Sequence, residues 1–474
     1  MSIVLPTSSD IMTLKEPDGI FATLIRSVLH LLALRSKSAQ SPIVVRIMFG
    51  NYPAQPVDCT EFIKTLTNHL PKNANLHIWV GAWRCGLTWN HAKFIAVDGR
   101  YLHTGGHNMW ELPYLKRNPI HDLSVEMEGS VARDAHLFAD QQWKFVKDRQ
   151  STFMGAIVDK LPDNLPLLTH TRVTVSEWPT KAANTFPPFF HERTGIIPNL
   201  NHVKMNVNID VQRVYSASSS QSVLEGFELK CEFSDTESNI VPVISIGRQG
   251  SMVSRTRPSD DAILAMINAS QQNLALVIQD LGPVCITGTT RAVPGLNWPK
   301  DYLTAIGNAI YERGVDVEII LSNPRSAPGG TDRKEGLRIA TPYGNGWDCV
   351  DVACEIIRAI QRAHTSVDDT KLRAMITDNL RVCFIRHNKS STYSDGNSIG
   401  LHTKHFIVDG RCCYIGSQNL YDSNLAEWGV VIDDADEVRK IQEEYFVPMW
   451  RNSFTGLDVD VQRVMDGLRV NRDN

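Results

Sequence analysis

The stretch His91-Ala-Lys-Phe-Ile-Ala-Val-Asp-Gly-Arg-Tyr-Leu-His-Thr-Gly-Gly-His-Asn108 is repeated, in altered form, as His402-Thr-Lys-His-Phe-Ile-Val-Asp-Gly-Arg-Cys-Cys-Tyr-Ile-Gly-Ser-Gln-Asn419. The two copies start 311 residues apart and are identical at eight of eighteen positions. Counted from the histidine, both have lysine at +2, aspartate at +7, glycine at +14 and asparagine at +17. Matching polar and glycine residues in one register indicate an internal duplication, which determines the architecture.

Each copy has the pattern of a β-hairpin. Histidine and lysine stand two residues apart, so on a strand they share one side. An apolar run follows, and then an Asp-Gly pair that is typical of a two-residue hairpin turn. The second strand ends at a glycine, beyond which the chain brings the asparagine back to the histidine end. The residues in these places are His91, Lys93, Asp98, Gly105 and Asn108 in one copy, and His402, Lys404, Asp409, Gly416 and Asn419 in the other.

Helix-like and strand-like segments alternate around both copies. The expected helices cover 61–70, 262–269, 302–313 and 350–363, and the expected strands cover 76–80, 274–279 and 315–321. Such alternation is typical of α/β folds with helices on both faces of a sheet. We therefore predict two similar α/β lobes related by a pseudo-twofold axis, over residues 1–200 and 201–474.

Composition excludes two classes of protein. The 474 residues include 48 basic and 52 acidic side chains, a net charge of −4, and 42% hydrophobic residues. A strongly basic nucleic-acid binder would carry a clear positive excess. An acidic disordered chain would have fewer hydrophobic residues. The composition fits a globular protein with a large core.

Targeting signals are lacking in the sequence as given. Nine cysteines, an odd number without a zinc-type pair, favour free buried thiols over a disulfide framework. The first residues show no signal-peptide pattern. The apolar stretch 20–34 contains Arg26 and His30 and predicts an amphipathic helix packed on the core. We expect a soluble, monomeric protein made in the cytoplasm, which is compatible with signal-independent export as an effector.

The paired segments resemble the HKD signature of the phospholipase D superfamily, written HxK(x)4D(x)6GSxN. The second copy matches throughout, including Ser417. In the first copy Gly106 occupies the serine position, so we expect one phosphate or substrate contact to be missing there. The family also places an acidic residue beyond each motif to orient a histidine, and Asp122 and Glu427 stand in those positions.

The resemblance implies metal-independent phosphodiester chemistry without a cofactor. One histidine attacks phosphorus to give a phosphohistidine, and the other protonates the leaving oxygen. Family analogy favours His91 as the nucleophile and His402 as the general acid, although the residues alone do not distinguish them. Charge on the phosphoryl oxygens would be neutralised by the lysines and asparagines of both motifs. Asp98 and Asp409, at the turns, are interpreted as structural anchors, together with the motif residues Gly105, Gly416 and Ser417.

Other residues near the motifs are ambiguous. Trp89 and Trp110 bracket the first copy and could form an apolar wall for an acyl chain or pack in the core. Gln279 and Asp280 follow an apolar strand, where α/β folds often place site residues, or could cap that strand. Three further histidines could suggest a metal cluster, but their places in the hairpin and beside Asp122 favour a site without metal: His103, His107 and His121.

Superfamily chemistry is shared among enzymes with different substrates, so three functions compete. The first is a phospholipase D that cleaves glycerophospholipids at a membrane surface, with water or an alcohol as acceptor. The second is a phosphatidyltransferase of the cardiolipin or phosphatidylserine synthase type. The third is a nuclease, which the absence of a basic cluster argues against. A non-enzymatic lipid-binding module is disfavoured by two intact sets of histidine, lysine and asparagine.

Overall fold

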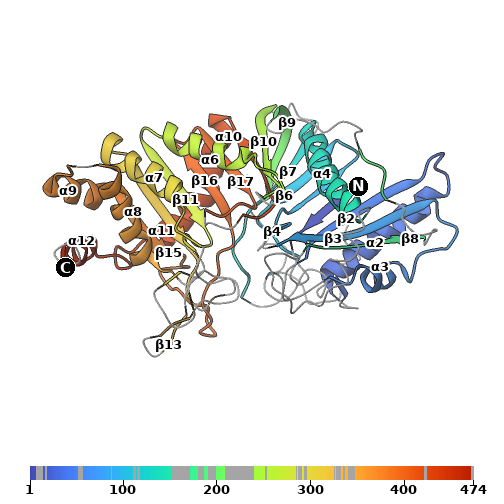
Figure 1. The fold of residues 1–474 in the computed structure, drawn as a ribbon, viewed down its shortest axis with the longest axis horizontal. Helices are drawn as coiled ribbons and strands as arrows, with labels where there is room; N and C mark the ends of the chain where they lie inside the picture. Colours follow the sequence, from blue (N-terminus) through green and yellow to red (C-terminus); the bar gives the residue numbers. More distant parts are fainter. Residues whose placement is uncertain are drawn as a thin grey trace.

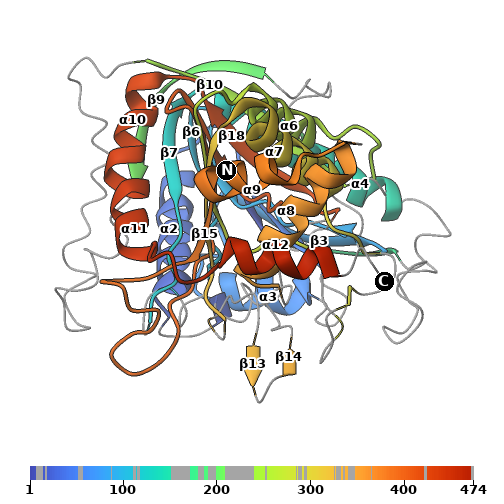
Figure 2. The same ribbon diagram turned by 90° about the vertical axis from the view of Figure 1, so that its left-hand side faces the viewer.

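A single mixed sheet of sixteen strands runs through the computed structural model (Figure 1). Helices lie on both sides of this sheet, as the view along it shows (Figure 2). The expected α/β architecture is therefore confirmed. The structure describes residues 1–6, 14–15, 19–51, 57–86, 88–109, 114, 118–150, 171–179, 186–190, 199–208, 240–250, 253–283, 286, 291–292, 296–324, 326, 332–334, 337–339, 347–364, 366–420 and 424–470.

The order of strands is repeated in the two halves of the chain. In each half, three parallel strands are followed by the motif hairpin and one further antiparallel strand. In the first half these are β3 (Leu76–Cys85), β2 (Ile43–Gly50), β1 (Ser2–Leu5), β5 (Phe94–Val97), β6 (Tyr101–Gly105) and β7 (Ser124–Gly129). In the second half they are β15 (Leu380–Phe384), β12 (Asp316–Leu321), β11 (Asn273–Ile278), β16 (Lys404–Val408), β17 (Cys412–Gly416) and β18 (Glu427–Ile432).

Two strands join the halves into one sheet. β9 (Asn199–Asn208) pairs with β7, and β10 (Val241–Arg248) pairs with both β9 and β18. At the far edge, β4 (Thr88–Trp89) and β8 (Thr171–Trp178) pair with β3. A separate hairpin joins β13 (Asp332–Lys334) to β14 (Leu337–Ile339). The repeated order of strands agrees with two similar lobes. The pseudo-twofold axis and the lobe boundary near residue 200 remain predictions.

The motif hairpins close with the turns that their Asp-Gly pairs predict. Both turn residues have positive φ in each hairpin, at 52° and 66° for Asp98 and Gly99 and at 52° and 60° for Asp409 and Gly410. This geometry matches the right-handed twist of paired strands. One detail differs from the prediction: the histidines precede the strands, which begin only at Phe94 and Lys404.

The helices that the sequence predicts are present, and further helices occur that it does not predict. The stretch expected to be amphipathic forms α2 (Ile20–Ser36), which buries Leu29 and Ala33 in the core. The expected helices and strands around the motifs are confirmed as well, apart from shifts at their ends. The remaining helices are α3 (Cys59–Thr67), α4 (Val131–Gln150), α6 (Pro258–Ala269), α7 (Lys300–Arg313), α8 (Cys349–Ala363), α9 (Asp369–Asn379), α10 (Ala435–Ile441), the π-helical turn η3 (Gln442–Phe446), α11 (Val447–Ser453) and α12 (Val461–Val470).

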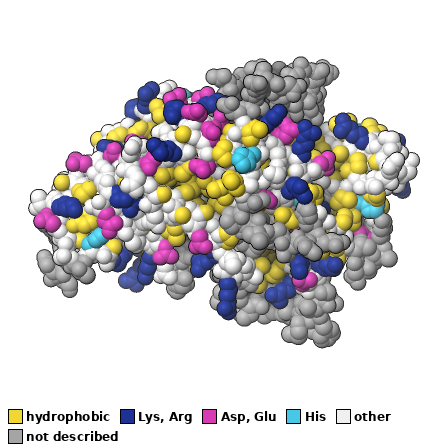
Figure 3. All heavy atoms as spheres, turned by 90° about the horizontal axis from the view of Figure 1, so that it is seen from above, with side chains coloured by type: hydrophobic (Ala, Val, Ile, Leu, Met, Phe, Trp, Pro, Cys, Tyr) yellow, Lys and Arg dark blue, Asp and Glu magenta, His cyan; other side chains and the backbone are white. Residues whose placement is uncertain are grey.

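Three further features concern the charge of the surface, the apolarity of the helices and the state of the cysteines. On the face shown in Figure 3, basic side chains are interspersed with acidic ones over the described residues. Among the helices that the structure describes, none combines the length and apolarity needed to cross a bilayer. The seven cysteines within the described residues are all free thiols.

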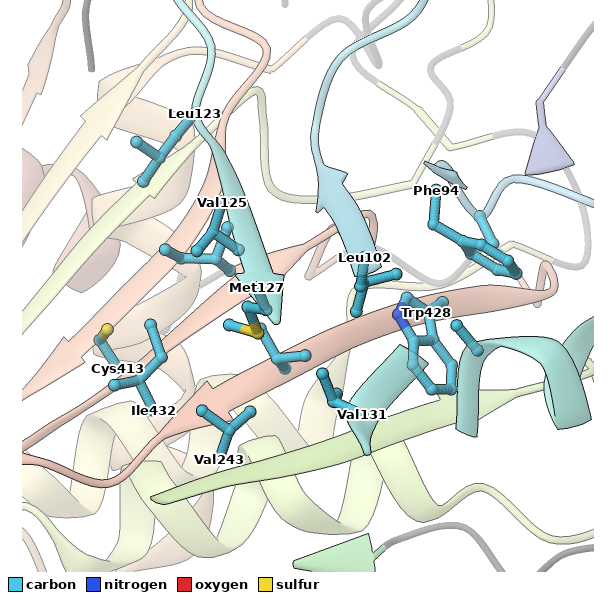
Figure 4. Packing of buried hydrophobic residues seen from close by; sticks show 14 of the residues in the cluster. Phe94, Leu102, Leu123, Val125, Met127, Val131, Val243, Cys413, Trp428 and Ile432 are labelled. Carbon is cyan, nitrogen blue, oxygen red and sulfur yellow. The ribbon is translucent and has the colours of Figure 1, made fainter. Parts of the chain in front are cut away.

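One hydrophobic cluster extends across both halves. It joins Val125 and Met127 of β7 to Cys413 of β17 and to Trp428 of β18 (Figure 4). All four side chains are buried. Because apolar contact crosses from one motif-bearing half to the other, the core fixes the two hairpins relative to each other.

Candidate active site

The segments that carry the histidines and the acidic residues lie side by side in a crossed arrangement. Asn90 forms a parallel bridge with Ala426, and the His91 N–H donates to the Ala426 carbonyl at 2.8 Å. In the other half-site, the His402 N–H donates to the carbonyl of His121 at 2.8 Å. The acidic residue that follows each motif therefore lies beside the histidine of the other motif.

Glu427 accordingly contacts His91. The imidazole Nδ1 lies 3.1 Å and 3.0 Å from the two carboxylate oxygens. Lys93 Nζ lies 3.2 Å from Nε2 of the same ring. A carboxylate only accepts and an ammonium only donates, so the proton of the neutral ring belongs on Nδ1. Nε2 is left with its lone pair.

His402 has the same arrangement with Asp122. Its Nδ1 lies 3.0 Å from Asp122 Oδ2 and 2.9 Å from the Gly106 carbonyl oxygen. Both neighbours accept hydrogen bonds, so Nδ1 carries the proton and Nε2 the lone pair. The His402 side chain is 4% exposed, against 13% for His91. In both half-sites the same ring nitrogen, Nε2, therefore keeps its lone pair.

Each motif lysine is fixed by the backbone of its own histidine. Lys93 Nζ donates to the His91 carbonyl at 2.8 Å, and Lys404 Nζ donates to the His402 carbonyl. Burial lowers the pKa of Lys404 to about 7, although Asp122 opposes this shift. A lysine with such a pKa is protonated only in part at neutral pH.

The electrostatic surroundings keep both imidazoles neutral. Burial lowers the pKa of His91 to about 4 against the opposing effect of Glu427. Burial, followed by Lys404, lowers the pKa of His402 to about 3. Lys404 also lowers the pKa of His91, and Lys93 lowers that of His402. Because charge interactions weaken with distance, this mutual influence indicates that the half-sites share one environment.

The two carboxylates remain ionised despite their burial. Burial tends to raise the pKa of Asp122, but His107, His402 and Lys404 outweigh it and hold the pKa below the usual range. For Glu427, burial is likewise outweighed, mainly by His91, and the pKa is again lowered. An ionised carboxylate on Nδ1 fixes the tautomer and favours protonation of Nε2 during a reaction.

The motif asparagines and glycines are buried as well. Asn108 and Asn419 are 3% and 1% exposed. A Cβ atom at Gly105 would lie 2.3 Å from the Leu123 carbonyl oxygen, so only glycine fits there. Gly416 is similar, with the Tyr414 hydroxyl at 2.3 Å from such a Cβ atom.

Ser417 does not project toward open space as a substrate contact would. Its hydroxyl donates to Glu427 Oε2 at 2.5 Å and accepts the Trp428 N–H at 3.1 Å. The motif serine therefore holds the carboxylate that orients His91. This differs from the expectation that the serine position supplies a phosphate or substrate contact.

The turn aspartates lie at the opposite end of the hairpins. Asp409 accepts the backbone N–H groups of Gln271, Gln272 and Asn273 at 2.8–2.9 Å, just before and at the start of β11. Asp98 interacts electrostatically with the amino group of Met1, beside the start of β1. The two aspartates thus occupy corresponding places against corresponding strands.

Of the four residues considered for substrate binding, three lie in the described part of the structure. Trp89 is half-buried in β4, and the carbonyl of Gln279 accepts the Ser322 N–H at 3.0 Å. Asp280 is 2% exposed at the end of β11 and raises the pKa of Lys404, which brings it into the electrostatic environment of the second half-site. Trp110 lies outside the described residues.

Two features of the site were missed in the sequence. One is the crossed pairing, in which Glu427 contacts His91 and Asp122 contacts His402. The motifs do not indicate which histidine each acidic residue contacts. The other is Tyr114, whose hydroxyl donates to Asp122 Oδ2 at 2.9 Å and lies 3.1 Å from His402 Nδ1. No periodic pattern or motif marks this tyrosine.

The three histidines considered as metal ligands do not form a metal-binding cluster among the described residues. Within the described ranges, no cluster of three or more metal-ligating side chains occurs. His103 lies 3.6 Å from Glu126 on the hairpin strands, and burial lowers the pKa of His121 to about 4.

Comparison with known proteins gives two sequence matches. Residues 263–450 match the family model described as "Cardiolipin synthase, PLD-like domain". The chain is also 23% identical over 375 residues to phospholipase D from Streptomyces antibioticus. That alignment covers 78% of this chain and 60% of the relative, so the chain spans about three fifths of the relative's length.

Solved structures with low similarity were also found. Phosphatidylserine synthase from Haemophilus influenzae Rd KW20 is 14% identical with a TM-score of 0.48, covering 99% of this chain and 87% of that one. Nuc from Salmonella typhimurium, described as a phospholipase D family member, is 14% identical with a TM-score of 0.26, covering 45% and 95%.

Two histidines, each backed by the carboxylate of the opposite motif and accompanied by a lysine, define a duplicated acid–base site on a mixed α/β sheet. The match of residues 263–450 to a PLD-like domain, the 23% identical relative and the paired motifs make this chain similar to the phospholipase D superfamily.

Proposed function

We propose that the protein is a phospholipase D-type phosphodiesterase that hydrolyses glycerophospholipids to phosphatidate and the free head-group alcohol. The observation that carries this proposal is the crossed pair of His–carboxylate contacts, His91–Glu427 and His402–Asp122. Both leave Nε2 with a lone pair, and each histidine is influenced by the lysine of the other motif. A phosphodiester between the two rings would meet a nucleophile on one side and a proton donor on the other.

The proposed reaction has two steps. His91 Nε2 attacks phosphorus, a P–N bond forms, and the P–O bond to the head group breaks while His402 donates its Nε2 proton to the leaving oxygen. Water then attacks phosphorus and loses a proton to His402, and the P–N bond breaks. The anionic substrate favours the protonated imidazole that the first step needs. Lys93 and Lys404 would neutralise the phosphoryl oxygens.

A lipid substrate at a membrane surface is supported by the curated relative, which is itself a phospholipase D. It also agrees with a net charge of −4, since nucleic-acid enzymes commonly present a basic groove. If an alcohol replaced water in the second step, the same chemistry would give transphosphatidylation as a side activity.

A phosphatidyltransferase is the second candidate. The matching family model carries the description of a cardiolipin synthase domain, and transfer differs from hydrolysis only in the acceptor. The two functions share the phosphohistidine step, so they are distinguished by the product that forms when water and an alcohol compete.

The decisive experiment incubates the purified protein with phosphatidylcholine liposomes and a primary alcohol, with single-stranded DNA in a parallel tube. We expect phosphatidate and phosphatidyl-alcohol, and we expect both to disappear in His91→Asn. The matched control is His103→Asn, a half-exposed histidine of the same hairpin that contacts neither carboxylate of the site.

Three results would redirect the proposal. Phosphatidyl-alcohol without phosphatidate would favour the transferase. DNA cleavage without lipid turnover would favour a nuclease. Lipid turnover that survives in His91→Asn would contradict the two-histidine chemistry.

A further inference from the structure

The two half-sites differ in how the buried carboxylate is held. In the half-site of His91, the Ser417 hydroxyl donates to Glu427 Oε2 at 2.5 Å. The corresponding motif position in the other half-site is Gly106, which has no hydroxyl to donate. A buried carboxylate needs its oxygens satisfied, because each lost hydrogen bond to a charged group is costly.

No side chain fits at Gly106. A Cβ atom there would lie 2.1 Å from Asp122 Oδ1 and 2.9 Å from the His402 carbonyl oxygen. Asp122 has little freedom to retreat, because Oδ1 accepts the Leu123 N–H at 2.9 Å and Oδ2 faces His402. The serine hydroxyl therefore cannot be supplied from this position while Asp122 stays in place.

Tyr114 supplies a hydroxyl from another part of the chain. It lies between the first motif and Asp122 in sequence and is 3% exposed. Its hydroxyl donates to Asp122 Oδ2 at 2.9 Å, the oxygen that His402 Nδ1 also contacts at 3.0 Å. The tyrosine ring lies edge-on to the His402 ring, with centroids 6.5 Å apart.

We infer that Tyr114 is a positioning residue that replaces the missing motif serine of the first half-site. By binding Asp122 Oδ2, its hydroxyl holds the carboxylate against His402 Nδ1 and so keeps His402 Nε2 directed into the site. The inference rests on the proposed function in one respect, that His402 takes part in the reaction. On this inference, the main role of the Tyr114 hydroxyl is to position Asp122 and not to contact the substrate.

The test compares Tyr114→Phe with Tyr393→Phe. Phenylalanine at 114 keeps the ring and removes only the hydroxyl. Tyr393 is the matched control, because its half-buried hydroxyl donates to the Pro119 carbonyl at 2.5 Å without touching Asp122 or His402. Two quantities are measured: kcat and KM on phosphatidylcholine, and the ¹⁵N and Nδ1-proton shifts of His402, assigned by their loss in His402→Asn.

We expect Tyr114→Phe to lower kcat by roughly ten- to hundredfold with little change in KM, as a lost hydrogen bond to a charged group would. The His402 shifts should move, and the His91 shifts should not. Tyr393→Phe should leave both kcat and the shifts close to those of the wild type.

Different failures remain distinguishable. Unchanged His402 shifts in Tyr114→Phe would overturn the inference, and so would a rise in KM alone, which would indicate a substrate contact. Changed shifts in a protein without diesterase activity would preserve the positioning role and refute the proposed function. If Tyr114→Phe does not fold, 3-fluorotyrosine at 114 keeps the hydroxyl and strengthens it as a donor. Unmoved His402 shifts in that protein would then overturn the inference.

Discussion

The two half-sites share a backbone frame but obtain their supporting side chains from different places. In both, a lysine donates to the carbonyl of its own histidine, and Nδ1 faces a carboxylate of the other half. The hydroxyl that holds that carboxylate comes from the motif in one case, Ser417, and from a residue outside the motif in the other, Tyr114. The comparison teaches that duplication preserved the geometry at the imidazole more closely than the residues that produce it.

The largest expected effect tests whether both half-sites are needed. We predict that His91→Asn and His402→Asn each lower phosphodiester turnover by about 10⁴-fold or more, because each removes a reacting group. Steady-state rates on phosphatidylcholine measure this. A variant that retained a tenth of the activity would show that one half-site is sufficient.

The crossed pairing predicts the next largest effect. Asp122→Asn should lower kcat by roughly 10²–10⁴-fold, since the amide offers a donor to Nδ1 and disfavours the reactive tautomer. In ¹⁵N spectra it should alter His402 and leave His91 unchanged, while Glu427→Gln should do the reverse. If each acid affected the histidine of its own motif, the crossed arrangement would be wrong.

A third prediction concerns the lysine of the second half-site. With a pKa lowered to about 7 by burial, Lys404 is protonated below pH 7 and loses its charge above it. Because kcat/KM reports groups of the free enzyme, it should fall about tenfold per pH unit above that value.

Lys404→Arg should remove this alkaline decline, although its plateau will be lower, because a guanidinium stays protonated. Lys93→Arg is the matched variant in the first half-site and should keep the decline. A pH profile that is unchanged in Lys404→Arg would assign the titration to another group.

The smallest expected effect concerns stability. His405 occupies the position of Phe94 in the first motif, and burial lowers its pKa to about 4. In the unfolded chain this histidine binds a proton below about pH 6.5, whereas in the native protein it binds one only below about pH 4. The free energy of unfolding therefore falls as the pH drops from about 6.5 to about 4. From pH 6.5 to 5 the loss is about 2 kcal/mol.

His405→Phe should remove that part of the pH dependence, which urea unfolding at pH 7 and pH 5 measures. Loss of the Nδ1 hydrogen bond to the Tyr414 carbonyl at 2.7 Å would lower stability equally at both values. An unchanged difference between the two pH values would show that His405 is not the group responsible.

Much of the fold and part of the site follow from local sequence. The Asp-Gly turns, the apolar strands beside them and the lysine two residues from each histidine are encoded within a few residues. The repeated register also predicts that His91 and His402 occupy equivalent places in their hairpins. These features depend on short-range geometry, which a sequence displays directly.

The remainder depends on contacts between distant residues. His91 and Glu427 are 336 residues apart, and which acid faces which histidine is settled only when the two halves share one sheet and one core. Gly106 appeared in the sequence as a missing contact. The structure explains the glycine, because Asp122 leaves no room for a side chain at position 106. The hydroxyl that binds Asp122 comes from Tyr114 instead.

The most direct test of the two-histidine mechanism is to identify the covalent intermediate by mass spectrometry. A short-chain phosphatidylcholine is mixed with His402→Asn and with His91→Asn, and the reactions are stopped at alkaline pH, where phosphohistidine survives. We predict a phosphatidyl adduct on His91 in His402→Asn and none in His91→Asn. An adduct on another residue, or none in either variant while the wild type turns over lipid, would contradict it.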